Sequence, residues 1–196
     1  MEAASRNATS PTLLPGSMSI EEMLDRAALQ RLAWTYCHAV DRRDYDLLRA
    51  LYHEDAIDDH SPMYCGPASG FVDWLPAMME NWEATAHILG NMMFLIDGNQ
   101  AEGELTSMAY HRTRDGRREF IAHGRYIDRY EKRDGVWKFL RRSLVLDWSE
   151  ERNVEAGGDF SLDGIALGKA GADDPCYERL PMLRRDRYSR FGKPGA

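Results

Sequence analysis

Residues 85–148 read TAHILGNMMFLIDGNQAEGELTSMAYHRTRDGRREFIAHGRYIDRYEKRDGVWKFLRRSLVLDW, and this stretch decides the fold. Long β-like runs fill it, and only the turn-forming sequences DGNQ, RDGR and RDG interrupt them. Asp-Gly and related turns between such runs are typical of β-hairpins. The pattern therefore predicts four consecutive antiparallel strands, at residues 85–97, 101–113, 118–132 and 136–148.

Helical patterns precede this meander. Residues 20–40 place Met23, Ala27, Leu32 and Tyr36 at helical steps, which predicts a helix with one apolar side. Further predicted elements are a short helix at 45–51, a strand at 53–61, a loop at 65–70 (CGPASG) and a third helix at 71–85, interrupted by Pro76. Helices followed by an antiparallel meander indicate an α+β fold, with the helices packed on one face of a curved sheet.

The length and the charge of the chain narrow its class. A length of 196 residues favours one main domain, which we place at residues 19–149. No apolar run approaches the ~20 residues that span a bilayer. The net charge of −7 comes without the basic patch that nucleic acid binding requires. We therefore expect no membrane partner and no nucleic acid partner. The three cysteines, Cys37, Cys65 and Cys176, form no disulfide framework, and the start of the chain has no signal-peptide core, which predicts a cytoplasmic location.

The two ends of the chain differ from this domain. Residues 1–18 lack the apolar core of a signal peptide and are predicted to be a disordered leader. Residues 150–196 form a Gly- and Asp-rich C-terminal extension that also carries apolar residues: Phe160, Leu162, Ile165, Leu167 and Tyr177. We predict that this extension docks, either as a lid over the mouth of a cavity or against a neighbouring subunit.

The residues with the strongest chemical signal are Asp41, where the first helix ends, and His87, within the first strand of the meander. A carboxylate beside an imidazole in an apolar cavity makes a general base that works near neutral pH. The plainer alternative is that Asp41 merely caps the second helix. His111, on the next strand, is a second histidine among apolar neighbours, and such a side chain needs a polar partner.

A metal site is the rival use of these residue types. Residues 53–60, HEDAIDDH, are dense in possible ligands but show no recognised ligand pattern. The sequence also contains no Gly-rich phosphate loop, no nucleotide-binding fingerprint and no GxSxG elbow. We therefore predict neither a metal site nor an organic cofactor.

The order helix–Asp–helix, strand with His, and meander closed by DGVWKF (134–139) resembles the SnoaL-like branch of the nuclear transport factor two-like superfamily, over residues ~20–148. Residues 36–52 (YCHAVDRRDYDLLRALY) and 85–91 (TAHILGN) are similar to the segments that carry the Asp–His dyad in scytalone dehydratase, hexachlorocyclohexane dehydrochlorinase and bile-acid 7α-dehydratase. The resemblance implies a sheet curved into a cone-like half-barrel, with the N-terminal helices on its concave face. We also expect a homo-oligomer, either a dimer or a trimer.

The resemblance also implies roles for residues around the dyad. Tyr36 falls where the bile-acid enzyme has a catalytic tyrosine, and Arg142 where dehydrochlorinases keep an arginine for the leaving group. His111 falls on the second histidine of scytalone dehydratase if one residue is skipped between the strands.

Three other positions depart from scytalone dehydratase. Val40, Gly124 and Tyr126 stand where that enzyme has a tyrosine, a serine and an asparagine. Scytalone itself is therefore not the expected substrate.

The implied activity is that of a cofactor-free lyase. His87 takes a proton from a substrate carbon while Asp41 stabilises the imidazolium that forms. Tyr36 and Arg142 hydrogen-bond to the departing or enolising oxygen. The same groups could run a retro-aldol-like loss of formaldehyde. The predicted substrate-binding residues suit a bulky hydrophobic, aromatic or polycyclic molecule; they are Trp34, Trp82, Met93, Phe94, Tyr126 and Trp148.

Two other classes of function stay open at this point. The fold also hosts non-catalytic binding or assembly proteins, such as the small subunits of ring-hydroxylating dioxygenases, so that fold alone does not decide function. A ketosteroid-isomerase-like proton shuttle is the second alternative, and it would carry its general base on a sheet strand. An Asp41–His87 contact inside a cavity favours the lyase over both.

Overall fold

The computed structural model describes residues 12–13, 16–154 and 161–191. Most of the predicted leader, and Phe160 of the extension, lie outside the described residues. The elements are α1 (Ile20–Asp41), α2 (Tyr45–Ala50), β1 (Tyr52–His60), β2 (Tyr64–Pro67), α3 (Ala68–Met79), β3 (Trp82–Asp97), β4 (Gln100–Thr113), β5 (Arg118–Arg133), β6 (Val136–Asn153), a 3₁₀ turn (Gly171–Asp173), α4 (Pro175–Arg179) and α5 (Pro181–Phe191).

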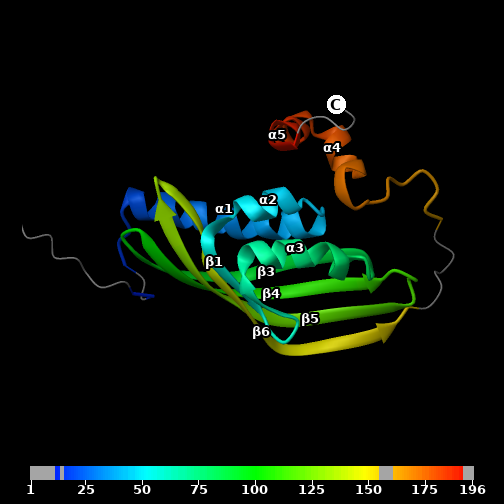
Figure 1. Cartoon of the computed structure of the whole chain (residues 1–196), viewed down its shortest axis with the longest axis horizontal. Coiled ribbons are helices and arrows are strands. Elements are labelled where there is room, and N and C mark those ends of the chain that lie inside the picture. Colours follow the sequence, from blue (N-terminus) through cyan, green and yellow to red (C-terminus); the bar gives the residue numbers. More distant parts are fainter. Residues whose placement is uncertain (1–11, 14–15, 155–160, 192–196) are drawn as a thin grey trace, which may run out of the picture.

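Six strands form one open sheet in the order β2-β1-β6-β5-β4-β3. Strands β3 to β6 are the predicted antiparallel meander, while β1 pairs parallel to β6 and antiparallel to β2. Figure 1 shows the long strands curving beneath α1, α2 and α3, which lie on one side of the sheet. The predicted α+β class, with N-terminal helices packed on a curved and mostly antiparallel sheet, is confirmed.

The turn between β5 and β6 shows how local chemistry produces the meander. Asp134 and Gly135 both have positive φ, at 52° and 78°. Two consecutive residues with positive φ are typical of the type I′ turn, whose twist matches that of the strands it joins. Asp and Gly are among the residues that adopt this conformation at the lowest cost.

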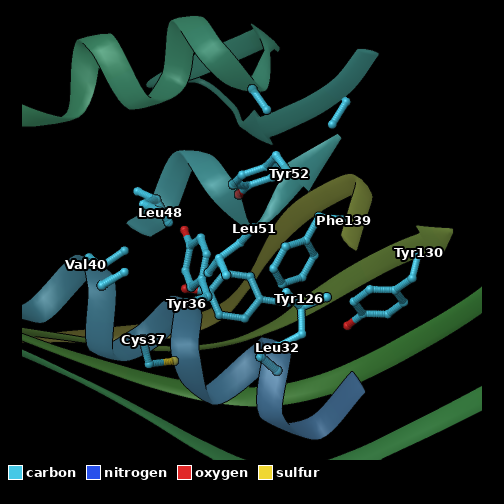
Figure 2. Packing of buried hydrophobic residues seen from close by; sticks show 14 of the residues in the cluster. Leu32, Tyr36, Cys37, Val40, Leu48, Leu51, Tyr52, Tyr126, Tyr130 and Phe139 are labelled. Atoms are coloured by element: carbon cyan, nitrogen blue, oxygen red, sulfur yellow. The ribbon is translucent and has the colours of Figure 1, made fainter. Parts of the chain in front are cut away.

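The core lies where α1 meets the centre of the sheet. Leu29, Leu32, Tyr36 and Val40 are buried on one side of α1, whereas Met23 is 57% exposed. The predicted apolar side is thus confirmed only from the middle of the helix onward. Figure 2 shows the aromatic rings that meet beneath this helix: Tyr36, Tyr52, Tyr126, Tyr130 and Phe139.

Two local predictions between residues 64 and 85 are wrong. The predicted loop contains a short edge strand, β2, in which Tyr64 pairs with His60. The third helix is not interrupted at Pro76 but runs on to Met79. Strand β3 begins three residues later, at Trp82. Buried Met79 anchors this last turn, and the amide of Glu80 donates to the carbonyl of Pro76 at 3.2 Å.

The C-terminal extension packs on the outer side of α1 and α2, away from the sheet (Figure 1). Arg42 Nη1 lies 2.9 Å from Asp174 Oδ2, and Arg187 Nη1 lies 3.1 Å from Asp44 Oδ2. Tyr177 is buried, as predicted. Leu162, Ile165 and Leu167 are each about half exposed in the single chain, so the prediction that they pack against a neighbouring subunit stays a prediction. Ion pairs and Tyr177 dock the extension.

Strand β6 runs past the predicted domain boundary at residue 149 to Asn153. Within the described residues, no helix combines the length and the apolar character needed to cross a membrane.

Candidate active site

A cavity of about 310 Å³ lies between the inner face of the sheet and helices α1 and α3. Its wall on the helix side is aromatic and sulfur-rich, with Phe71, Trp74 and Met78 of α3. The sheet side carries small residues at its centre, Ser107 and Ala109 of β4 and Ala122 and Gly124 of β5, beside larger ones such as Phe120 and Leu144. A space of this lining suits a flat, apolar molecule. No described residue of the C-terminal extension lines this cavity.

Gly124 lies at the register shift between β5 and β6. A Cβ at this position would lie 2.2 Å from the carbonyl oxygen of Val145, which belongs to the backbone and cannot rotate away. Glycine is therefore required by the backbone packing at this point of the cavity wall.

Asp41 and His87 meet in the wall of this cavity. Nδ1 of His87 donates to Asp41 Oδ1 at 2.7 Å, and the backbone amide of His87 donates to Asp41 Oδ2 at 2.8 Å. Thr85 Oγ1 also donates to Asp41 Oδ1, at 2.9 Å. Both side chains are about one-tenth exposed. Because the carboxylate holds the proton of Nδ1, the basic nitrogen of the imidazole ring is Nε2.

The end of α1 explains how Asp41 becomes available for this contact. Arg43 adopts a positive φ of 54°, which turns the chain sharply after the helix. Its guanidinium donates to the carbonyl of Val40 at 3.1 Å and to Thr85 Oγ1 at 3.0 Å. The side chain that caps α2 is Asp44, which accepts from the amide of Leu47 at 3.1 Å. The alternative that Asp41 caps the second helix is therefore wrong.

The surroundings of Asp41 keep its carboxylate charged. Burial by itself raises the pKa of Asp41, but the hydrogen bonds and charge of His87 and the hydroxyl of Thr85 outweigh it, so that the pKa lies below its usual range. The pair thus has the electrostatics of a general base backed by an anion.

His111 lies beside the pair. Its ring meets that of His87 edge-on, with 5.6 Å between the centroids, and it packs against Trp82 at 4.9 Å. Burial, followed by the charge of His87, lowers the pKa of His111 to about 4. The second histidine is therefore neutral near pH 7. Its Nδ1 is buried without a hydrogen-bond partner among the described residues.

This burial predicts a pH dependence of stability. As the pH falls from about 6.5 towards 4, the unfolded chain binds a proton at His111 that the folded chain does not bind, so the folded state loses about 2–3 kcal/mol. His111→Phe should remove this loss, measured by urea unfolding at pH 7 and pH 4.5. Asp41 loses its stabilising charge only at lower pH, because its pKa is depressed. Parallel pH dependences of the two proteins would contradict the assignment.

Arg142 does not reach the cavity. It is completely buried and makes two hydrogen bonds to Asp128, Nε to Oδ1 at 2.9 Å and Nη2 to Oδ2 at 2.7 Å. Its guanidinium carbon lies 4.0 Å from the ring centroids of both Tyr36 and Tyr126, and these two tyrosines line the cavity in its place. The structure thus places Arg142 behind aromatic rings, where it cannot contact a leaving group directly.

Tyr36 itself lies in the cavity wall, as the resemblance implies. Burial raises the pKa of the Tyr36 hydroxyl well above its usual value, so that the hydroxyl remains protonated and able to donate. Burial also raises the pKa of Tyr126.

Of the six predicted substrate-binding residues, two line the cavity, Trp82 and Tyr126. Trp34 lies on the outer side of α1 and is 55% exposed, and Phe94 is buried in the core against Tyr130. Met93 and Trp148 are 44% and 49% exposed. None of these four lines the cavity, so that their assignment as substrate-binding residues is corrected here.

Two β-bulges explain the positions of Met93 and Trp148. The register of β3 shifts between Leu89 and Met92, and that of β5 with β6 shifts beside Trp148. One extra residue moves every following side chain to the opposite face of the strand. Trp148 therefore stacks on His123 at 3.7 Å outside the cavity, although Leu144 and Leu146 of the same strand line it.

A further pair in this cavity was missed from the sequence. His60 lines the wall, and its Nδ1 lies 2.5 Å from Asp58 Oδ1. The two residues stand two positions apart in one strand, and such residues share a face. That spacing within HEDAIDDH, a predicted strand, is the signal that points to the pair. Within the described part of the chain, no group of three or more His, Cys, Asp or Glu side chains is placed to hold a metal ion.

Comparison with known proteins defines the class. The SnoaL-like domain matches residues 21–143, and the chain belongs to this family. Uncharacterized protein Rv2910c of Mycobacterium tuberculosis is 27% identical over 128 residues, which cover 64% of this chain and 87% of that protein. The gamma-hexachlorocyclohexane dehydrochlorinase of Sphingobium indicum is 24% identical over 156 residues, which cover 78% of this chain and 98% of that enzyme.

Solved structures agree with this placement. A scytalone dehydratase-like protein from Novosphingobium aromaticivorans has a TM-score of 0.64 and 25% identity, over 71% of this chain and 95% of that chain. A type 2 hexachlorocyclohexane dehydrochlorinase has the same TM-score at 22% identity, over 74% and 99%, which supports the fold alone. Together the dehydratase and dehydrochlorinase relatives support a cofactor-free, lyase-like role, in a family that also has non-catalytic members.

Proposed function

We propose that this protein is a cofactor-independent lyase that uses His87 as the base for an elimination reaction. One observation carries the proposal: His87 lies in the wall of an apolar cavity with its Nδ1 bound to the buried carboxylate of Asp41. This arrangement leaves Nε2 as the only basic nitrogen of the ring. General bases of this kind work best with a pKa near the working pH.

The proposed reaction follows from this geometry. Nε2 of His87 takes a proton from a substrate carbon, and the electron pair of that C–H bond forms the new double bond. The leaving group departs from the neighbouring carbon with its own bonding pair, and the imidazolium later returns its proton to water. Asp41 stays ionised and stabilises the imidazolium. Tyr36 supplies a protonated hydroxyl to the departing or enolising oxygen.

The substrate is proposed to be a bulky hydrophobic molecule, aromatic or polycyclic. The wide apolar surface of Phe71, Trp74 and Trp82 favours such a molecule over a sugar or a nucleotide. The bond broken is C–O, C–halogen or, in a retro-aldol-like variant, C–C. The buried position of Arg142 favours Tyr36 as the group that contacts the leaving atom.

The proposal is tested with a panel of aryl and polycyclic compounds. Each carries a hydroxyl or halide leaving group on the carbon next to one with an acidic C–H bond. Purified protein should convert at least one of them, with loss of water or hydrogen halide detected by mass spectrometry. Treatment with a metal chelator should leave the rate unchanged. Saturable binding of several compounds without any conversion would instead favour the non-catalytic binding protein.

A further inference from the structure

The cavity contains a second histidine that a buried carboxylate holds in place. His60, at the end of β1, is 8% exposed and stacks on Phe71 with 4.8 Å between ring centroids. Asp58 is completely buried beside it and contacts His60 Nδ1 through Oδ1 at 2.5 Å. The lyase proposal uses neither of these residues.

Asp58 is itself firmly oriented. The hydroxyl of Tyr52 donates to its Oδ2 at 2.6 Å, so that each carboxylate oxygen has one short hydrogen bond. Asp58 also lies opposite Arg142 in the register of β1 with β6. A carboxylate oxygen accepts hydrogen bonds, and Nδ1 of His60, which faces Asp58 Oδ1, is therefore the ring nitrogen that carries the proton.

It follows that Nε2 of His60 is a hydrogen-bond acceptor. No described residue donates a hydrogen bond to this atom, and the ring lies in the cavity wall. The side chain is largely buried while its Nε2 is accessible from the cavity, so that the donor for this acceptor comes from whatever fills the cavity. A hydroxyl group can donate such a bond, whereas an ether or a halogen at the same place cannot.

His60 and His87 lie on strands near opposite edges of the sheet, and both face the same cavity. Strands β6, β5 and β4 separate β1 from β3, a distance of about 19 Å measured along the sheet. Between them the sheet side of the cavity is lined by Leu144 and Leu146 of β6 and by the small residues Ala109, Ala122 and Gly124, an apolar surface over which a flat molecule can lie. The cavity therefore has an acceptor on one side, the base on the other, and a flat apolar region between them.

We propose that His60, positioned by Asp58, determines specificity by accepting a hydrogen bond from a hydroxyl group on the substrate. The ligand class is a flat, mainly aromatic molecule whose phenolic or alcoholic hydroxyl lies at the end remote from the carbon that His87 deprotonates. This inference deepens the lyase proposal and rests on it for the statement that the ligand is a substrate. The hydroxyl recognition itself is a statement about binding.

Calorimetric titration of the full chain with 4-hydroxystilbene and with 4-methoxystilbene tests the inference. The two probes share size and flatness, but only the first can donate a hydrogen bond. Wild-type protein should bind the hydroxylated probe about tenfold more tightly, the size of effect that one good hydrogen bond gives. His60→Phe keeps an aromatic ring against Phe71, and in this variant the preference should disappear while the affinity for the methoxy probe changes less than about threefold.

His87→Ala is the matched control, because it removes the other carboxylate-bound histidine. This variant should keep the hydroxyl preference while it loses turnover, which separates failure of the inference from failure of the lyase proposal. If His60→Phe does not fold, His60→Leu, which also lacks a hydrogen-bond acceptor, replaces it. Imidazole ¹⁵N spectra of wild-type protein then give a second measurement, in which only the hydroxylated probe should shift the Nε2 signal of His60.

Three results would overturn the inference. They are equal affinity of wild-type protein for the two probes, a preference that survives in both His60 variants, and a preference that is lost in His87→Ala. Absence of binding by both probes would also count against the proposed ligand class.

Discussion

Replacing His87 with alanine is expected to lower kcat by about 10²- to 10⁴-fold, the usual contribution of a positioned general base. The side chain lies in the cavity wall and contacts Asp41 at 2.7 Å, so its loss removes the base without disturbing the core. Asp41→Asn should cost nearly as much, because an amide cannot stabilise the imidazolium and can impose the wrong tautomer on His87. Turnover of a substrate found in the panel is the measurement.

The double variant makes this prediction sharper. Since Asp41 acts through His87, combining the two changes should lower kcat little more than the worse single change does. Thermal unfolding of each variant serves as the control for folding. Losses that multiply in the double variant would mean that the two residues act independently, and the dyad would then have to be abandoned.

Breaking the Arg142–Asp128 pair should have the largest effect on stability. Both side chains are completely buried, and removing one partner leaves the other charge without compensation in the core. Arg142→Met should therefore lower the free energy of unfolding by about 3–5 kcal/mol. Arg142→Met with Asp128→Leu should recover a large part of this loss, because neither partner of the pair is then left as an uncompensated buried charge. Urea unfolding at pH 7 provides the measurement.

A matched surface pair controls for the general effect of removing an arginine. Arg49 and Asp73 form an ion pair at 2.6 Å, with side chains 44% and 71% exposed. Arg49→Met should change the free energy of unfolding by less than about 1 kcal/mol. If Arg142→Met were equally mild, the buried pair would contribute nothing to stability and its place in the core would need another explanation.

The parts of the fold that the sequence predicts are those governed by local chemistry. Alternating strands joined by Asp-Gly turns need little information from outside their own residues, and the meander is confirmed over its whole length. The Asp41–His87 contact could also be anticipated, because both residues interrupt apolar patterns, one at a helix end and one inside a strand.

The sequence could not predict which face of the sheet several side chains occupy, because this depends on how neighbouring strands pair. The bulge near Gly90 turns Met93 outward, and the bulge beside Trp148 turns the Trp148 side chain outward. Neither methionine nor tryptophan is itself a signal for a bulge. Arg142 looked available as a catalytic group, but the curvature of the sheet places it beneath Tyr36 and against Asp128. The pairing of Asp58 with His60 required knowing that their strand faces the cavity.

The small residues beneath the cavity decide how its ligand preference could be altered by engineering. Gly124 cannot be enlarged, because even one added methyl group collides with the backbone oxygen of Val145 at 2.2 Å. Ala109 and Ala122 pair across β4 and β5, and both line the same cavity. Variant libraries that aim to reshape the cavity for smaller molecules should therefore enlarge these two alanines and leave Gly124 unchanged.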